Sequence, residues 1–432
     1  MTAHLREGVP TIVAAEGFDL IDEQGRRYLD GISSLWCNVH GHRVEAIDAA
    51  IRDQLDRVAH TTLLGLGSDR ADELAERLVR LSPDRLRHVF YSDSGSTAVE
   101  AALKIAWQYH RQKPQPDDRN VFLTVSGAYH GDTIGSVSLG SIRLFHQVYG
   151  GLLFDTVSVP SPGQFPRPPE LSREQWHEHC RETVAATARE HGDRLAAIVI
   201  EPLVQGAAGI WTHPPGYLSL LRDLADETGA LLIADEVAVG FGRTGTLLAC
   251  EQEAVAPDLL CLAKGLTGGY LPLAATLATE AIFEAFLGEP HEGRTFFHGH
   301  TFTGNPLACA AALASLDLFE QDDTLAHAAT LAAALREELA TLAEHPHVAE
   351  IRQCGTMVGI ELAGSREPYQ PLPAERRTGH RVTLAARERG LIVRPLGDVV
   401  VLMPALAMPV ETVRRLVRGT IAGIDAVTGD GN

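Results

Sequence analysis

Buried strands and amphipathic helices alternate through the first three quarters of the chain. Short apolar runs bounded by polar residues are typical of strands that are covered on both faces of a parallel sheet. Between these runs apolar residues recur at helical spacing, most clearly in the segment that follows Ser94-Gly95-Ser96. The expected strands cover residues 88–93, 121–125, 195–200, 231–235 and 259–263. This alternation predicts an α/β fold with a doubly wound, mainly parallel sheet.

The two ends of the chain show a different pattern. Residues 16–30 alternate about a Glu-Gln-Gly turn and predict a hairpin, and the polar segment 31–42 after it predicts no regular element. Beyond residue 321 an Ala/Glu-rich helix is followed by strands near 348–362 and 392–403. We therefore expect a large α/β domain, residues 41–321, and a smaller α+β domain that residues 1–40 and 322–432 form together.

The size and charge of the chain limit what it binds. A chain of 432 residues is long enough for two domains. Its formal net charge of −19 argues against nucleic acid or an anionic membrane as a partner. No apolar run reaches the ~18–20 residues that span a bilayer, and the first residues lack the apolar core of a signal peptide. The six cysteines form no C-x-x-C pair, which predicts reduced thiols and a cytoplasmic location.

Two charged residues stand at the ends of expected strands. Asp235 closes the run 231–235, and Lys264 follows the run 259–263. Open α/β sheets bind ligands at the carboxyl ends of their strands, so both side chains are expected at the ligand edge. There they suit pyridoxal 5′-phosphate (PLP), because a lysine can form a Schiff base and a carboxylate can pair with the protonated pyridine nitrogen. Each residue alone also fits a simpler interpretation, as a solvated turn lysine and as a helix-capping or metal-binding acid.

Two other patterns suggest different cofactors. Residues 240–245 read Gly-Phe-Gly-Arg-Thr-Gly, but they do not directly follow the strand, and no clear helix start comes after them, as a nicotinamide or flavin site requires. His298 and His300 could ligate a metal, yet no Cys, Asp or Glu stands close enough in the sequence to complete the set. We therefore expect no metal site and keep a nicotinamide oxidoreductase only as an alternative.

A phosphate site is expected at the start of the helix after residue 94. Ser94-Gly95-Ser96 precedes this helix, and the free N–H groups and dipole of a helix N-terminus attract anions. Thr97 and Glu100 have the spacing of a capping box. Tyr129 follows the strand at 121–125 and could stack on a flat ring, although it could also be a plain loop aromatic.

Long motifs of the chain follow one another in a characteristic order. They are SDSGSTAVEAALKIAWQYH, GAYHGDTIGSVS, IADEVAVGFGRTG, KGLTGGYLP and HGHTFTGNPLACA. These motifs resemble those of the class III aminotransferases of PLP fold type I. The resemblance implies PLP as cofactor, Lys264 as the catalytic Schiff-base lysine and Asp235 as the partner of the pyridine nitrogen. It also implies that Gly95 and Ser96 hold the phosphate.

The same resemblance implies the surroundings of the ring and of the substrate. Tyr129, which is also expected to serve catalysis, would lie over one face of the ring and Val237 over the other. Thr301 would reach the phosphate of the neighbouring subunit's cofactor, so a homodimer with shared active sites is implied. Substrate binding is implied for Trp36, Gly299 and His300 in addition to Tyr129.

The substrate class depends on three positions. Family members that use glutamate carry a Glu after Gln-Gly and an arginine in the last strand, where this chain has Ala207 and Val401. Arg394 stands instead where the branch that aminates 8-amino-7-oxononanoate in biotin synthesis binds the distal carboxylate of its keto substrate. The resemblance to that branch implies the same reaction, with lysine or S-adenosylmethionine as amino donor. Leu35 replaces a tryptophan of the tunnel and favours lysine.

Two further functions remain as alternatives. The chain could be a general ω-aminotransferase that acts on another pair of amine and keto acid. It could also be a degenerate, non-catalytic protein of the same fold that only binds ligands.

Overall fold

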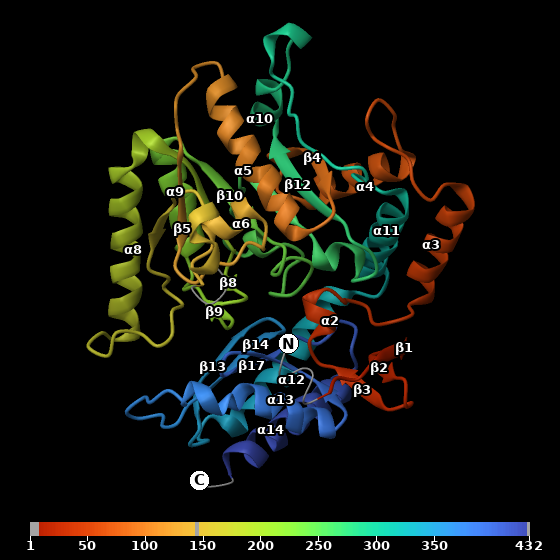
Figure 1. Cartoon of the computed structure of the whole chain (residues 1–432), viewed down its shortest axis with the longest axis vertical. Helices are drawn as coiled ribbons and strands as arrows, with labels where there is room; N and C mark the ends of the chain where they lie inside the picture. The colour runs from red at the N-terminus through yellow and green to blue at the C-terminus, as the bar shows by residue number, and fades with distance from the viewer. Residues whose placement is uncertain (1–7, 143–146, 430–432) are drawn as a thin grey trace.

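A seven-stranded sheet forms the centre of the larger lobe in this computed structural model, which describes residues 8–142 and 147–429 (Figure 1). Its strand order is β4-β12-β11-β10-β7-β5-β6. The strands are β4 (Leu86–Ser92), β5 (Val121–Val125), β6 (Val157–Val159), β7 (Leu195–Ile200), β10 (Leu231–Asp235), β11 (Leu259–Leu262) and β12 (Ala274–Thr279). The pairs from β6 to β11 are parallel, and β12 runs antiparallel to both of its neighbours. The expected α/β class and mainly parallel sheet are confirmed, whereas β12 was not predicted.

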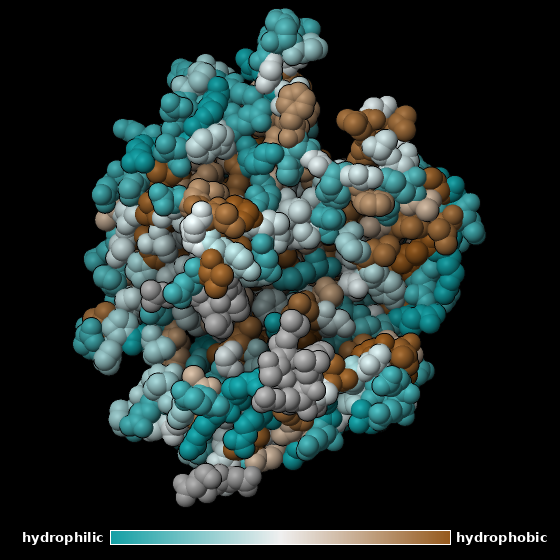
Figure 2. All heavy atoms as spheres, viewed as in Figure 1, coloured by the Kyte–Doolittle hydropathy of each residue, from teal (hydrophilic) through white to brown (hydrophobic). Residues whose placement is uncertain are grey.

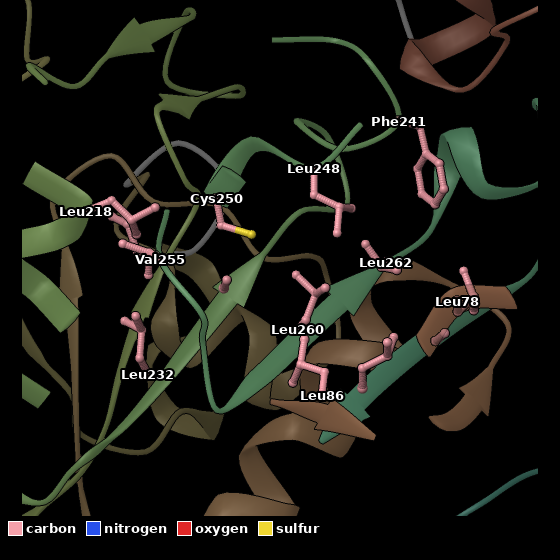
Figure 3. Close-up of a cluster of buried hydrophobic side chains, with 14 of the residues drawn as sticks. Leu78, Leu86, Leu218, Leu232, Phe241, Leu248, Cys250, Val255, Leu260 and Leu262 are labelled. Carbon is pink, nitrogen blue, oxygen red and sulfur yellow. The ribbon is translucent and has the colours of Figure 1, made fainter. Parts of the chain in front are cut away.

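Helices cover both faces of this sheet, which explains why its strands are apolar throughout. Leu231 and Ile233 of β10 pack in one core cluster with helix α5, and Leu232 and Ala234 pack in another with α4, α9 and α11. Figure 3 shows part of the second cluster around Leu232. The helices of this lobe are α3 (Glu45–Arg57), α4 (Asp69–Leu81), α5 (Gly95–Gln112), α6 (Ile134–Leu139), α8 (Arg173–Glu190), α9 (Tyr217–Thr228), α10 (Glu280–Ala285) and α11 (Pro306–Gln321). Among the described residues, no helix is long and apolar enough to cross a bilayer.

The smaller lobe joins the two ends of the chain. An antiparallel sheet of order β13-β14-β17-β16 packs against helices α12, α13 and α14, and strand β15 pairs in parallel with β3 of the N-terminal hairpin. Its elements are β1 (Ile12–Glu16), β2 (Asp19–Asp22), β3 (Arg27–Asp30), α12 (Thr324–Leu339), β13 (Val348–Cys354), β14 (Met357–Leu362), α13 (Thr378–Glu388), β15 (Leu391–Ile392), β16 (Arg394–Leu396), β17 (Val399–Leu402) and α14 (Val410–Thr428). The predicted hairpin at residues 16–30 is present as β2 and β3.

Short elements complete the connections. They are the turn α2 (Ser33–Trp36), the strand pair β8 (Val204–Gln205) and β9 (Trp211–Thr212), and the 3-10 helices η1 (Gln147–Leu152), η2 (Gly192–Arg194), η3 (Ala249–Glu253), η4 (Lys264–Thr267), η5 (Pro290–Glu292), η6 (Ala340–Leu342) and η7 (Ala374–Arg376).

The N-terminus of α5 differs from the expected capping box. Ser94 is the N-cap, and its side chain pairs with Thr97 as the third residue of the helix. Glu100 lies one turn further along and instead accepts the backbone N–H groups of Gly135, at 2.6 Å, and Ser136. The predicted Thr97–Glu100 box is therefore wrong, because the helix begins at Gly95 and places Thr97 inside it.

Candidate active site

A cavity of about 480 Å³ opens at the carboxyl edge of the seven-stranded sheet. Its walls come from several of the predicted site residues, together with neighbours that were not predicted. The predicted residues that line it are Trp36, Gly95, Ser96, Tyr129, Asp235, Val237 and Lys264. These seven residues come from different parts of the chain and meet in one cavity.

Asp235 and Lys264 reach the cavity from adjacent strands. Asp235 is the last residue of β10 and is paired in parallel register with Cys261 of β11, and Lys264 follows β11 at the start of η4. The backbone of Lys264 has a φ of 44°, in the left-handed region. Burial lowers the pKa of the Lys264 amine, and the nearby carboxylates of Asp235 and Glu201 oppose that effect without cancelling it. The lysine is thus more easily deprotonated than an ordinary surface lysine.

The loop after β10 carries the G-x-G-x-x-G sequence, and its surroundings exclude a dinucleotide fingerprint there. Residues 240–245 form successive turns, and η3 begins only at Ala249. A Cβ added at Gly242 would lie 2.6 Å from a methyl of Leu406, so the second glycine serves close packing rather than the approach of a pyrophosphate. The nicotinamide alternative loses its structural basis.

His130 is a site residue that the sequence analysis did not single out. Its Nδ1 lies 2.7 Å from Oδ2 of Asp235, while Oδ1 of Asp235 accepts the N–H of Val237 at 3.0 Å. Burial lowers the pKa of His130, but the hydrogen bond and charge of Asp235 outweigh burial, with a contribution from Glu201, so the net shift is upward. The Nε2 atom is buried and has no hydrogen-bond partner among the described residues. The only feature of the sequence that could have indicated a role for His130 was its position directly after Tyr129.

Glu201 is a second buried carboxyl group in this wall. It follows β7, and its oxygens accept the N–H of Gly206 at 2.9 Å and of Tyr129 at 3.3 Å. Burial raises the pKa of Glu201 to about 7, with the Asp235 charge acting in the same direction and His130 against it. Its signal in the sequence was a polar residue at the end of a buried strand, the same signal that identified Asp235.

The N-terminus of α5 forms one end of the cavity. A Cβ added at Gly95 would lie 2.5 Å from Cγ1 of Val237, and one added at Gly131 would lie 1.9 Å from Oγ of Ser96. Both glycines therefore let backbone segments approach more closely than any side chain would allow. The first N–H groups of a helix have no intrahelical partner, so this end of the cavity is suited to an anion.

Two aromatic residues form part of the wall. The Tyr129 hydroxyl donates to Asp132 Oδ2 at 2.9 Å, and burial raises its pKa while the charge of Arg394 acts in the opposite direction. Trp36 is buried, and the Nζ atom of Lys264 lies 4.7 Å from the centre of its ring. Flat aromatic surfaces in the wall suit a planar aromatic ligand.

Arg394 lies outside the residues that line the cavity but close to it. It begins β16 and is directly opposite Val401 of β17, so the two side chains leave the same face of the sheet. Val401 packs in one cluster with Trp36, and Ala207 packs against that cluster. The guanidinium of Arg394 is exposed, and its charge acts to lower the pKa of the Tyr129 hydroxyl. A positive charge therefore lies near the mouth of the cavity.

Gly299, His300 and Thr301 are absent from the cavity that this chain forms. They lie between η5 and α11, where Gly299 and Thr301 are exposed and His300 Nε2 is 3.7 Å from Asp93 Oδ1. No group of three or more potential metal ligands lies together in residues 8–142 and 147–429. These three residues are therefore not part of the wall that this one chain forms.

The cavity has the groups that PLP requires. An amine with a lowered pKa, a buried carboxylate, a helix N-terminus and flat walls surround one space. Lys264 would hold the aldehyde carbon, Asp235 the pyridine nitrogen, and Gly95 and Ser96 the phosphate. The charges in the wall match the ligand, because a helix N-terminus suits its phosphate and a carboxylate suits its pyridine nitrogen.

Comparisons with known proteins agree with this fit. The family model described as aminotransferase class-III matches residues 5–421. The chain is 58% identical over 427 residues to an adenosylmethionine-8-amino-7-oxononanoate aminotransferase of Nitratidesulfovibrio vulgaris, covering 98% of this chain and 79% of that protein. It is 48% identical to the protein of the same name from Geobacter sulfurreducens, covering 97% and 92% of the two chains.

Solved structures show the same fold. The crystal structure of an adenosylmethionine-8-amino-7-oxononanoate aminotransferase from Methanocaldococcus jannaschii superposes with a TM-score of 0.93 at 38% identity, covering 99% of this chain and 95% of that one. An amine transaminase from an uncultivated Pseudomonas species, solved in its PLP-bound form, gives a TM-score of 0.92 at 36% identity over 98% and 96% of the chains. The chain therefore belongs to the class III aminotransferases, enzymes that depend on PLP.

Proposed function

We propose that the protein transfers an amino group to 8-amino-7-oxononanoate in biotin synthesis, with lysine or S-adenosylmethionine as donor. The identity of 58% to a relative with that acceptor in its name, over 98% of this chain, carries the proposal. The geometry supports it, since the residues at the mouth of the cavity suit a keto acid whose carboxylate is remote from its ketone.

The residues of the cavity would divide the chemistry between them. Bound PLP supplies a protonated pyridine ring that takes up the electron pair of the substrate carbon. Lys264 would take the proton from that carbon and return it one position away, which its lowered pKa favours. Asp235 would keep the pyridine nitrogen protonated, and His130 would hold the Asp235 carboxylate in place through their bond of 2.7 Å.

Three positions support the choice of acceptor. Ala207 and Val401 offer no charge to an α-carboxylate, since both belong to or pack against the apolar cluster around Trp36. Arg394 is opposite Val401 and supplies a guanidinium outside the residues that line the cavity. A carboxylate at the far end of an extended substrate would reach it, whereas glutamate or 2-oxoglutarate would find no clamp near the reacting carbon.

We also propose a homodimer in which Thr301 of each subunit completes the phosphate site of the other. Apolar side chains on projecting segments support this arrangement, among them Leu64 and Leu66, which are 89% and 61% exposed. Figure 2 shows apolar atoms where the loop between α3 and α4 projects at the upper right. A second copy would cover them.

Two further proposals concern location and domain organisation. All six cysteines are free thiols, which supports a reducing compartment such as the cytoplasm. Separate core clusters in the two lobes support a division into residues 41–321 and residues 1–40 with 322–432.

A donor and acceptor screen tests the proposed reaction. The PLP form is mixed with lysine, S-adenosylmethionine, alanine or glutamate, and the loss of its visible absorbance is followed. The resulting pyridoxamine form of the enzyme is then mixed with 8-amino-7-oxononanoate. Recovery of the absorbance with this keto acid, and slow reaction with glutamate, are expected; no recovery would contradict the proposal.

A general amine transaminase is the second candidate. It is favoured by the amine transaminase of the uncultivated Pseudomonas species, whose fold covers 98% of this chain. In the same screen this candidate predicts fast reaction with simple amines or alanine and no preference for 8-amino-7-oxononanoate.

A further inference from the structure

The turn Ser33–Trp36 has a backbone that L-amino acids rarely adopt. Its residues have φ values of 50°, 48°, 76° and 72°, and none of them is glycine. In this left-handed region the Cβ atom crowds the following carbonyl oxygen, so such a run persists only where its surroundings enforce it. The Trp36 N–H donates to the Ile32 carbonyl oxygen at 2.8 Å and closes the turn. The groups that hold it must lie outside these residues.

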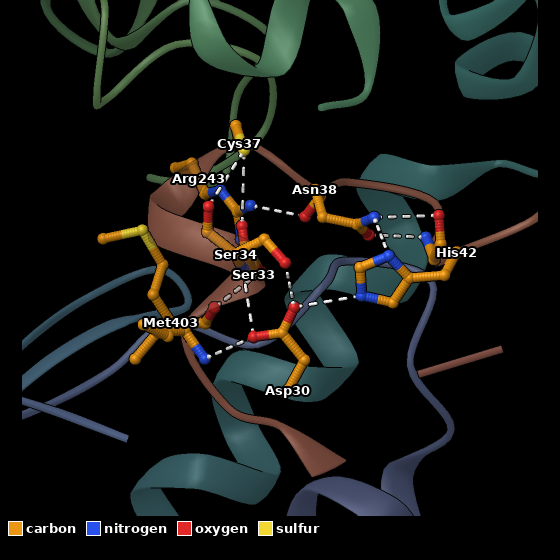
Figure 4. A network of polar contacts seen from close by, with 10 residues as sticks. Asp30, Ser33, Ser34, Cys37, Asn38, His42, Arg243 and Met403 are labelled. Carbon is orange, nitrogen blue, oxygen red and sulfur yellow. Dashed lines mark hydrogen bonds and ion pairs between the residues drawn. The ribbon is translucent and has the colours of Figure 1, made fainter. Parts of the chain in front are cut away.

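Asp30 holds the turn from one side (Figure 4). Its Oδ1 accepts the N–H of Ser34 at 3.0 Å, and its Oδ2 accepts the Ser34 hydroxyl at 2.7 Å. Nε2 of His42 lies 3.1 Å from the same Oδ2. Burial of Asp30, which is 3% exposed, raises its pKa, but the bonds from His42 and Ser34 outweigh burial and the net shift is downward. The side chain is therefore a charged carboxylate whose two oxygens are both engaged.

The opposite side of the turn is held by the end of β17 and by the loop after β10. The Ser33 hydroxyl donates to the carbonyl oxygen of Met403 at 2.6 Å. The buried guanidinium of Arg243 donates to the carbonyl oxygens of Pro404, at 2.6 Å, and Asn38, at 2.8 Å. The Ser33 bond fixes the turn to the small lobe, and Arg243 fixes Asn38, two residues beyond the turn, to the loop that carries the G-x-G-x-x-G sequence.

Trp36 is what the turn presents to the active site. The centre of its ring lies 4.7 Å from Nζ of Lys264, close enough for the ring face to attract an ammonium group. A Cβ added at Gly206 would lie 3.1 Å from the indole, so the ring has little room on that side. A shift of the turn would therefore change the surroundings of the reactive amine.

We propose that Asp30 is a positioning residue of the active site, because it holds the left-handed turn that places Trp36 against the Lys264 amine. Asp30 itself does not line the cavity. Without its carboxylate the turn would relax toward the right-handed region and the indole would leave the amine. The proposal rests on the aminotransferase chemistry of Lys264 and is independent of which keto acid is the acceptor.

A double-mutant cycle between Asp30→Asn and Trp36→Ala tests this link. The measured quantity is the single-turnover rate at which an amine donor bleaches the PLP form. Asp30→Asn should slow the wild-type reaction about tenfold or more, because small displacements of active-site groups are costly. In the Trp36→Ala background the same substitution should have little further effect. Equal losses in both backgrounds would show that Asp30 acts by another route and would overturn the proposal.

Near-UV circular dichroism of the protein without PLP provides a readout that needs no substrate. The difference between wild type and Trp36→Phe defines the signal of Trp36, and Asp30→Asn should lose that signal. The double variant Asp30→Asn/Leu35→Gly should regain it, because glycine adopts a left-handed backbone without strain. Retention of the signal in a folded Asp30→Asn protein would also overturn the proposal, even if 8-amino-7-oxononanoate were not the acceptor.

Asp22→Asn is the matched control. Asp22 is equally buried and holds the neighbouring hairpin turn by accepting the N–H groups of Gln24 and Arg26, but it lies outside the cavity lining. The Asp22→Asn variant should have a lower Tm than wild type but the same Trp36 signal in the near-UV spectrum. If Asp30→Asn does not fold, Ser34→Ala removes only the 2.7 Å bond to Asp30 and should give a smaller loss of the same signal; an unchanged signal there would contradict the proposal.

Discussion

The imidazole of His130 and the carboxylate of Asp235 meet at 2.7 Å in the wall of the active-site cavity. Asp235 ends β10 and His130 lies in the loop after β5, and these two strands are separated in the sheet by β7. The raised pKa of His130 means that the ring holds its proton more firmly than a free histidine does. One carboxylate oxygen is therefore occupied by His130 and the other by the N–H of Val237, which leaves Asp235 little freedom to turn.

Asp235→Asn should reduce turnover at least about a hundredfold while PLP still binds, because a neutral amide cannot keep the pyridine nitrogen protonated. Steady-state rates and PLP titration by absorbance measure the two effects. Asp258→Asn is the control, since Asp258 is also buried and paired but precedes β11 at the opposite end of the sheet. Near-normal turnover of Asp235→Asn would contradict its assigned role.

Gly95→Ala should weaken PLP binding, because its Cβ would lie 2.5 Å from Val237 and would separate the start of α5 from the loop after β10. The PLP dissociation constant, measured by absorbance or fluorescence, should rise by about fivefold to a hundredfold, for a loss of roughly 1–3 kcal/mol from overpacking. Gly192→Ala serves as control, since its Cβ would meet only Thr228 at 3.8 Å. Unchanged affinity in Gly95→Ala would show that this contact does not shape the phosphate site.

Arg394→Ala should raise the KM for 8-amino-7-oxononanoate about tenfold or more and leave the donor half-reaction nearly unchanged, because a charged hydrogen bond contributes roughly 1.5–3 kcal/mol. The two half-reactions are measured separately by stopped-flow absorbance. Arg389→Ala, a change at the exposed end of α13 where the guanidinium donates to the Ala385 carbonyl oxygen, should affect neither. A parallel loss in both half-reactions would argue against a role confined to the acceptor.

Mixed dimers test the sharing of the active site. Alone, the Lys264→Ala chain should be nearly inactive and the Thr301→Ala chain should bind PLP weakly. The two chains are unfolded together and refolded, and the heterodimer is isolated by affinity tags. If Thr301 completes the neighbour's site, the heterodimer contains one site with both residues intact and should recover about half of the wild-type activity per dimer. No recovery in a confirmed heterodimer would place both residues in the same site of one chain.

The stability of the protein without PLP should fall as the pH rises from about 5 to 7, in part because of Glu236. This carboxyl group is buried and accepts the N–H groups of Ala249 and Cys250, and burial raises its pKa to about 7 from an ordinary 4.5. Between these two values the unfolded chain has already lost the proton that the folded protein keeps, so unfolding becomes easier, by up to about 3 kcal/mol.

Glu236→Gln removes that titration, and Tm measurements at several pH values check it. The variant is expected to be less stable than wild type at pH 5, since the amide replaces one acceptor, but its Tm should decline less toward pH 7.5. Curves that run parallel over this range would show that Glu236 titrates normally.

The sequence predicted the position of the site well and its supporting residues poorly. Asp235 and Lys264 could be placed because each ends an apolar run, and the ends of parallel strands meet at one edge. His130 meets Asp235 only through the spatial order of β5, β7 and β10, which hydrophobic periodicity does not encode. Glu201 ends a buried strand as Asp235 does, but the same spatial order is needed to place it in this wall. Strand β12 was missed because its alanines and threonines lack the large apolar residues of its neighbours.

The left-handed turn could not have been predicted from local sequence. Ser33, Ser34, Leu35 and Trp36 have no preference for positive φ, and a glycine would be the usual sign of it. One of the bonds that hold the turn spans 370 residues, from the Ser33 hydroxyl to Met403. A backbone conformation that depends on such distant partners is determined by the whole fold, so it cannot be predicted from any short segment of the sequence.

The parallel pairing of β10 with β11 has a consequence for how the substrate range of this enzyme can change. Asp235 and Lys264 extend from neighbouring strands whose separation, about 4.8 Å, is fixed by backbone hydrogen bonds and not by any side chain. Arg394 belongs instead to β16, in a sheet of the other lobe. Substitutions in that lobe can therefore alter which keto acid or amine fits while the reacting pair keeps its spacing. Directed evolution for a new substrate would be most productive around Arg394, because changes there leave both the reacting pair and the turn that carries Trp36 in place.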